Sequence, residues 1–201
     1  MAVPWAIASV EMQQVADDTG VKPLINNECT NLRPFDVGTI VWSDIVTVGE
    51  KIWQIVEAGK PVVSVQVPVA FALPRGLTCW TDLDHWQVPR TQTYEVRYKN
   101  YFGVEVVHFR FRLQYTYGGG NDGVGRYLAN VTVMPAELNV AWGYDFNAVV
   151  EVEQAVNMGS KKDPLAGLEL NLKWTVKTVL KESDNSFHFF VQGDGAVKTA
   201  E

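Results

Sequence analysis

The chain has 201 residues, of which 47% are hydrophobic and 20% charged, and its formal net charge is −6. This length and composition predict one globular domain with a sizeable core. The acidic balance argues against a nucleic-acid partner, because phosphate contacts need clustered Lys and Arg, and no apolar run is long enough for a transmembrane segment.

The N-terminal segment, up to residue 35, has the least regular pattern of what we predict to be a single β-rich domain over residues 1–201. The stretch AIASVEMQQVA fits either a strand or a short helix. No Lys or Arg precedes Lys22, so the basic region of a secretory signal is missing. The protein is then either cytoplasmic or a mature form whose signal peptide is absent from this chain. The abundance of Asn, Thr, Gly and Trp favours the second interpretation, with an extracellular or periplasmic location.

Cys29 and Cys79 are the two cysteines and make one possible disulfide. In the chain-entropy model, closing a loop of roughly 50 residues contributes on the order of 4 kcal/mol. The alternative is a pair of buried thiols, which behave as small apolar side chains.

The stretch TVGEKIWQIVEAGKP predicts one short α-helix over residues 48–58. Thr47 and Glu50 fit a capping box, and apolar residues then recur at helical spacing. Gly59 suits the end of this helix, and Pro61 prevents its continuation.

Most of the chain after this segment alternates apolar and polar residues with a period of two, which is the period of a half-buried strand. The alternating stretches cover residues 62–73, 94–99, 107–117, 126–133, 138–152, 168–177 and 187–191. Turn signals separate them. The pattern predicts a mainly β fold, namely an antiparallel β-sandwich or, alternatively, a β-barrel.

The register of one hairpin also follows from the sequence. Asn100 and Gly103 suit the first and last positions of a type I turn. Pairing these two residues puts Val96 opposite Val107 and makes the apolar faces of both strands coincide.

The stretch GGGNDG at residues 118–123 matches the G-x-G-x-x-G spacing of a dinucleotide-binding loop. Such a loop must open a helix whose N-terminus holds the phosphates, but residues 124–133 alternate like a strand. We therefore predict no cofactor and interpret the glycines as a wide, mobile hairpin connection. In the alternative, Asn121 and Asp122 contact a ligand at the rim of a binding face.

The stretch CWTDLDHW contains a candidate ligand-binding site made of Trp80, Asp82, Asp84, His85 and Trp86. Loop aromatics suit stacking on sugar rings, so we expect a carbohydrate or another cell-envelope component as the ligand. In the alternative, the indoles anchor the loop and the carboxylates are solvated. The spacing matches no EF-hand or zinc motif, so no metal site is predicted.

Basic side chains fall on the polar faces of neighbouring strands, at Arg97, Lys99, Arg110 and Arg112. They predict a basic face for an anionic glycan, a lipid headgroup or an acidic protein. In the alternative, acids of the same sheet such as Glu95 neutralise them. The predicted register also places His108 opposite Glu95.

No catalytic residue is predicted. The chain has three histidines, no G-x-S-x-G elbow, and no carboxylate pair that its spacing singles out. We therefore predict a non-catalytic, secreted or periplasmic β-sandwich protein that acts as a binding or structural module. The alternatives are a protein–protein association module, a membrane-active β protein and, last, a hydrolase.

Overall fold

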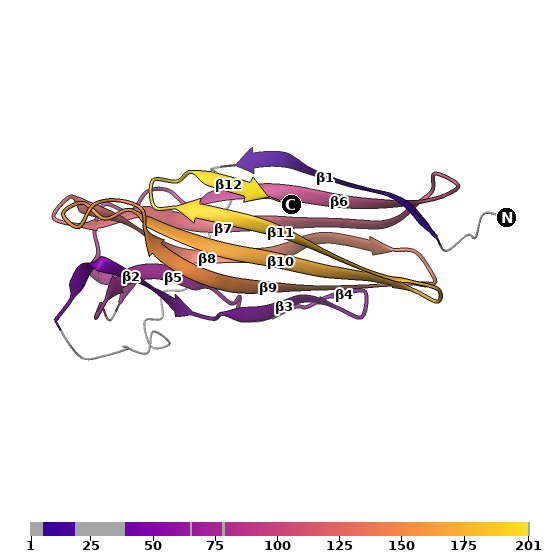
Figure 1. The fold of residues 1–201 in the computed structure, drawn as a ribbon, viewed down its shortest axis with the longest axis horizontal. Coiled ribbons are helices and arrows are strands. Elements are labelled where there is room, and N and C mark those ends of the chain that lie inside the picture. The colour runs from indigo at the N-terminus through magenta and orange to yellow at the C-terminus, as the bar shows by residue number, and fades with distance from the viewer. Residues whose placement is uncertain (1–5, 19–38, 65, 78, 201) are drawn as a thin grey trace.

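The computed structural model describes residues 6–18, 39–64, 66–77 and 79–200, and it contains two six-stranded antiparallel sheets. Sheet A has the strand order β1-β6-β7-β8-β5-β2, and sheet B has the order β12-β11-β10-β9-β3-β4. Their long strands run along the longest axis of the molecule (Figure 1). The two sheets pack face to face without closing into a barrel, which confirms the predicted β-sandwich.

The strands of the two sheets have the following bounds. Sheet A contains β1 (Ile7–Asp18), β2 (Val41–Gly49), β5 (Ala70–Arg75), β6 (Arg90–Asn100), β7 (Glu105–Asn121) and β8 (Val124–Val140). Sheet B contains β3 (Ile52–Glu57), β4 (Lys60–Pro61), β9 (Tyr144–Asn157), β10 (Ala166–Thr178), β11 (Glu182–Gln192) and β12 (Val197–Ala200). A single 3₁₀ turn, η2 (Trp80–Asp82), lies in the described part of the connection between β5 and β6.

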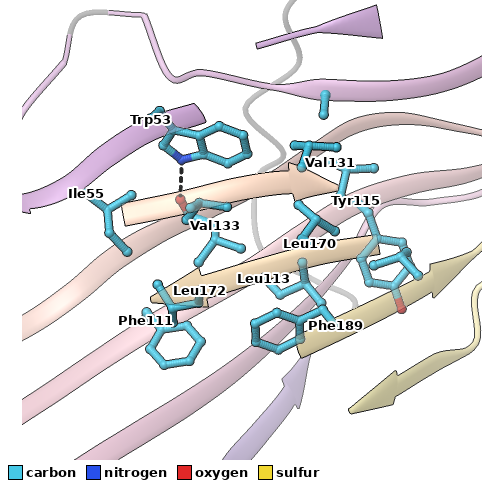
Figure 2. Close-up of a cluster of buried hydrophobic side chains, with 14 of the residues drawn as sticks. Trp53, Ile55, Phe111, Leu113, Tyr115, Val131, Val133, Leu170, Leu172 and Phe189 are labelled. Atoms are coloured by element: carbon cyan, nitrogen blue, oxygen red, sulfur yellow. Dashed lines mark hydrogen bonds between the residues drawn. The ribbon is translucent and has the colours of Figure 1, made fainter. Parts of the chain in front are cut away.

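The core lies between the sheets and is rich in aromatic side chains. The rings of Phe109 from sheet A and Phe146 from sheet B have centroids 4.9 Å apart. Figure 2 shows Leu113 of β7 close to Leu170 of β10 and Phe189 of β11. Inward side chains alternate with outward polar ones along these strands, as the sequence pattern predicted.

The predicted helix over residues 48–58 is wrong, because this segment holds the end of β2, all of β3 and a turn. Along β3, Trp53 and Ile55 are buried, and Gln54 between them is exposed. Ala58 and Gly59, with φ of 46° and 71°, form a left-handed two-residue turn into β4. The apolar run is compatible with both a helix and a strand, and pairing of β3 with β9 decides for the strand.

The turn predicted at residues 100–103 is present, with Gly103 N donating to Asn100 O at 2.9 Å. The predicted strand register is wrong by two residues, so that Val96 lies opposite Phe109. The extra residues are accommodated by an added residue in the turn and by a bulge near the start of β7. A shift of two keeps every side chain on its predicted face.

The glycine-rich stretch connects β7 and β8, but not as the wide loop that we predicted. Residues 118–121 belong to β7, and only Asp122 and Gly123 form the turn, with φ of 50° and 76°. These angles fit a type I′ turn, the tight connection typical of two-residue hairpins.

The N-terminal segment contains a long edge strand. Residues 7–18, which fitted a strand or a short helix, form β1 and pair with β6. Residues 19–38 lie outside the described part of the chain, and β2 then begins at the opposite edge of sheet A.

Candidate functional site

The two predicted ligand-binding groups lie at the same end of the molecule. Asp84, in the loop between β5 and β6, exchanges two backbone hydrogen bonds of 2.9 Å with Gly120 of β7. Gln87 N donates to Tyr117 O at 2.9 Å. The tryptophan-rich loop is therefore attached to the tip of the β7–β8 hairpin, which carries Asn121 and Asp122.

The two indoles of this loop pack against the protein. Trp80 is only 8% exposed, and its ring meets that of Trp86 edge-on at 5.5 Å. Trp86 Nε1 donates to Trp80 O at 3.3 Å. A Cβ placed on Gly119 would lie 2.3 Å from the Trp86 ring, so the strand accepts this ring only because residue 119 has no side chain. The indoles thus anchor the loop.

The polar members of the site are exposed. Asp82, Asp84, His85 and Asp122 face solvent, and His85 Nδ1 lies 2.6 Å from Asp84 Oδ1. Carbohydrate binding by this loop stays a prediction, which would depend on these polar groups more than on indole stacking.

The predicted disulfide falls partly outside the described residues. Cys79 is buried next to η2, and its Sγ lies 2.7 Å from Thr81 Oγ1. Cys29 belongs to the segment that the structure does not describe, so this disulfide stays a prediction.

The basic face on sheet A is interleaved with carboxylates. Glu95, on β6 and 2% exposed, lies 3.0 Å from Arg97 Nη2 and 3.2 Å from Arg110 Nη2. His108 Nε2 lies 3.2 Å from the same carboxylate, and Gln13 Nε2 donates to it at 2.5 Å. We call these five residues the Glu95 cluster.

The remaining basic residues are divided between paired and unpaired side chains. Lys99 lies 3.7 Å from Glu11 of β1. Arg112 is exposed, and no carboxylate of the described residues lies within ion-pair distance of it. The alternative interpretation of this face, internal neutralisation, therefore accounts for three of the four basic side chains.

The electrostatics of the Glu95 cluster favour the ionised carboxylate. Burial alone would raise the pKa of Glu95, but the hydrogen bonds from Gln13, His108, Arg110 and Arg97 outweigh it and lower this pKa from 4.5 to about 2. Glu95 therefore stays charged at neutral pH and holds two guanidinium groups on the outer face of sheet A.

An apolar groove of about 500 Å³ lies where β3 and β4 of sheet B meet β8 of sheet A. Its lining includes Trp53, Ile55, Val63, Val133, Met134 and Pro135. Trp53 Nε1 donates to Val133 O at 3.1 Å and so joins the two sheets across the groove (Figure 2).

The sequence did not indicate this groove. Its walls come from segments about 70 residues apart. One of these segments, β3, was wrongly predicted to be part of a helix over residues 48–58. The available signal was three prolines, Pro61, Pro68 and Pro135, each of which removes a backbone donor and so limits strand pairing.

Two smaller cavities share one wall around Trp174. They have volumes of about 340 and 420 Å³, and both are lined by Trp174, Asp184, Asn185 and Ser186. Tyr98 OH accepts hydrogen bonds from Trp174 Nε1 at 2.7 Å and from Asn185 Nδ2 at 2.8 Å. The polar groups at the base of these cavities are therefore partly satisfied within the protein.

Comparisons with protein-family models, curated proteins and solved structures found no match for this chain. Within the described residues, no helix has the length and apolar character needed to cross a membrane. The chemical character of the sites is therefore the basis for the functional proposal.

Proposed function

We propose that this protein is a non-catalytic binding protein whose apolar groove holds the alkyl chain of a cell-envelope component. The observation that carries the proposal is the lining of the groove, which contains no charged residue. Its volume of about 500 Å³ falls within the range of about 300–1,000 Å³ that is usual for small-molecule sites.

The two polar side chains of the groove are already hydrogen-bonded to the backbone. Gln54 Nε2 donates to Val56 O and to Ala148 O, the latter at 3.2 Å. Ser64 Oγ donates to Gln66 O. A polar ligand would lose its bonds to water and gain few in the groove, whereas an alkyl chain loses none.

The rim of the groove is also apolar. Val63 is 94% exposed and Val62 is 37% exposed. Covering such side chains with a ligand removes apolar surface from water, which contributes roughly 25 cal/mol for each Å². An alkyl ligand therefore stabilises a surface that is otherwise unfavourably hydrated.

Binding without catalysis agrees with the positions of the histidines. None of the three cavities described above is lined by a histidine. His108 lies in the Glu95 cluster, and His85 lies in the exposed loop beside Asp84. An envelope ligand also agrees with the extracellular or periplasmic location favoured by the composition. Protein–protein association and membrane activity stay alternative predictions.

Titration with a fluorescent fatty acid, with Val63→Asp as the test variant, examines this proposal. Val63 is almost fully exposed, so the substitution should leave the fold intact while placing a carboxylate at the mouth of the groove. We expect affinity to fall about tenfold or more, the equivalent of 1.4 kcal/mol.

Val179→Asp is the matched control. Val179 is 85% exposed in the turn between β10 and β11 and does not line the groove. The control should bind as the wild type does. Saturable binding that is equally strong in both variants would place the ligand elsewhere, and no binding by the wild type would remove the proposal.

A further inference from the structure

Three ligand-type side chains converge on the outer face of sheet B, away from the apolar groove. They are Glu153 on β9, Glu169 on β10 and His188 on β11. One carboxylate or imidazole atom of each residue lies within 4.8 Å of the corresponding atoms of the others. Three neighbouring strands thus each contribute one donor.

Strand register places these side chains together. Neighbours of Glu169 and His188 along their strands, such as Leu170 and Phe189, are fully buried, so the two polar residues face outward. The pairing of β9 with β10 is irregular next to Glu153, where Gln154 lies opposite Glu169 but Val152 lies opposite Leu170. A bulge of this kind re-aims the extra side chain, here toward the other two donors.

The cluster carries two carboxylates that no Lys or Arg of the described residues neutralises. His188 Nδ1 lies 3.9 Å from Glu169 Oε1, and Gln154 Nε2 donates to Glu169 Oε2 at 3.0 Å. Among the described residues, no Lys or Arg lies within ion-pair distance of Glu153 or Glu169, and the nearby Lys173 is bound to Glu151 at 2.5 Å. The Glu95 cluster, in contrast, has two guanidinium groups.

The side-chain oxygen of a buried amide beside the cluster has no hydrogen-bond donor among the described residues. Asn171 is 5% exposed, lies opposite His188, and donates from Nδ2 to Glu153 Oε1 at 3.1 Å. Its Oδ1 is buried and accepts no hydrogen bond. A buried acceptor without a partner costs about 1–3 kcal/mol. A cation bound between Glu153 and Glu169 would remove the repulsion between their carboxylates.

We propose that Glu153, Glu169 and His188, with the Asn171 amide beside them, form a binding site for a divalent transition-metal ion. Imidazole is a preferred ligand of zinc and related ions, whereas calcium and magnesium select oxygen donors alone. Two carboxylates and one imidazole leave a coordination position for water or for an external ligand. The site is separate from the alkyl-chain groove and does not depend on it.

Isothermal titration of the full chain with Zn²⁺ tests the site. We expect one ion per chain, and binding at least tenfold weaker in His188→Asn, Glu169→Gln and Glu153→Gln. Asn171→Ala should weaken binding about tenfold to a hundredfold, the range for partners that orient a metal ligand. An excess of Ca²⁺ should not displace Zn²⁺.

His85→Asn is the matched control, because His85 is exposed and also lies beside a carboxylate, that of Asp84. Asparagine tolerates the positive φ of 60° at this position. The control should bind Zn²⁺ as the wild type does.

Circular dichroism checks that each variant is folded, and the exposed Glu153 provides a test even if Glu169→Gln disturbs the sheet. The proposal is overturned if Zn²⁺ produces no saturable binding. It is also overturned if His188→Asn and Glu153→Gln bind as the wild type does, or if His85→Asn loses as much affinity as they do.

Discussion

Replacing Glu95 with Gln should destabilise the protein at neutral pH and remove part of its sensitivity to acid. The Glu95 carboxylate is 2% exposed and has four side-chain partners. In the variant, the neutral amide cannot balance the guanidinium groups of Arg97 and Arg110, which lie within 3.2 Å of the wild-type carboxylate.

The size of the effect follows from the pKa of Glu95. A folded-state pKa of about 2, against an ordinary value of 4.5, corresponds to about 3 kcal/mol of stability at neutral pH. Because the folded-state pKa is the lower one, this contribution is fully present above pH 4.5 and is lost as the pH falls toward 2. The guanidinium groups are more than a third exposed, so solvent reduces the measured loss to about 2 kcal/mol.

Urea unfolding at pH 7, 4 and 3 measures this contribution. The difference in unfolding free energy between wild type and Glu95→Gln should be about 2 kcal/mol at pH 7 and should shrink steadily as the pH falls from 4.5. Glu11→Gln, which alters a 63% exposed carboxylate on the neighbouring strand, should change stability by less than about 0.5 kcal/mol. A difference that stays constant from pH 7 to pH 3 would refute the reasoning.

Two further substitutions test a close contact at Gly119 and a buried amide at Asn130. Gly119→Ala should lower the free energy of unfolding by about 1–3 kcal/mol, because its Cβ meets the Trp86 ring. Urea unfolding should show a smaller loss when the same substitution is made in the Trp86→Ala variant. An equal loss in both backgrounds would contradict this contact. Asn130→Gly should raise the unfolding free energy by about 0.5–1 kcal/mol, because Asn130 is buried at φ 51° and neither polar atom of its amide has a partner among the described residues. A loss of more than 1 kcal/mol for Asn130→Gly would show that this amide is satisfied in solution.

The fold class was predictable because burial between two sheets imposes a period of two on the sequence. Along β7, for example, Phe109, Phe111 and Leu113 are fully buried, and the alternation of these residues with arginines was visible without a structure. The turn at Asn100 was predictable for a local reason, since its residues suit a type I turn.

The errors arose where distant segments decide local structure. Residues 52–57 form a strand because β9 offers a partner about 95 residues away, and no local pattern contains that information. The register of the β6–β7 hairpin depends on extra residues that the alternation cannot reveal. Pairing with β9 decided the structure in the first case, and an added turn residue and a bulge set the register in the second.

The candidate sites were predictable only in part. Trp80 and Trp86 were placed in one candidate site because they are close along the chain, and their rings are in contact. The hydrogen bonds that attach their loop to the tip of the β7–β8 hairpin are visible only in the structure. Arg97 and Arg110 were correctly placed on one face, and the alternative that Glu95 neutralises them describes the arrangement found. The apolar groove is built from segments far apart in the sequence. The grouping of Glu153, Glu169 and His188 depends on strand register and a bulge, so residue spacing could not indicate either site.

The most direct test of the alkyl-chain proposal is a two-dimensional NMR titration of the wild type with a medium-chain fatty acid. If the alkyl chain binds in the groove, the NMR signals of the Trp53 indole N–H and the Met134 methyl group should show saturable chemical-shift changes, because both residues line the groove. The indole signals of Trp86 and Trp174, which do not line the groove, should stay in place. Shifts at Trp174 or Trp86 without shifts at Trp53 and Met134 would contradict the proposal.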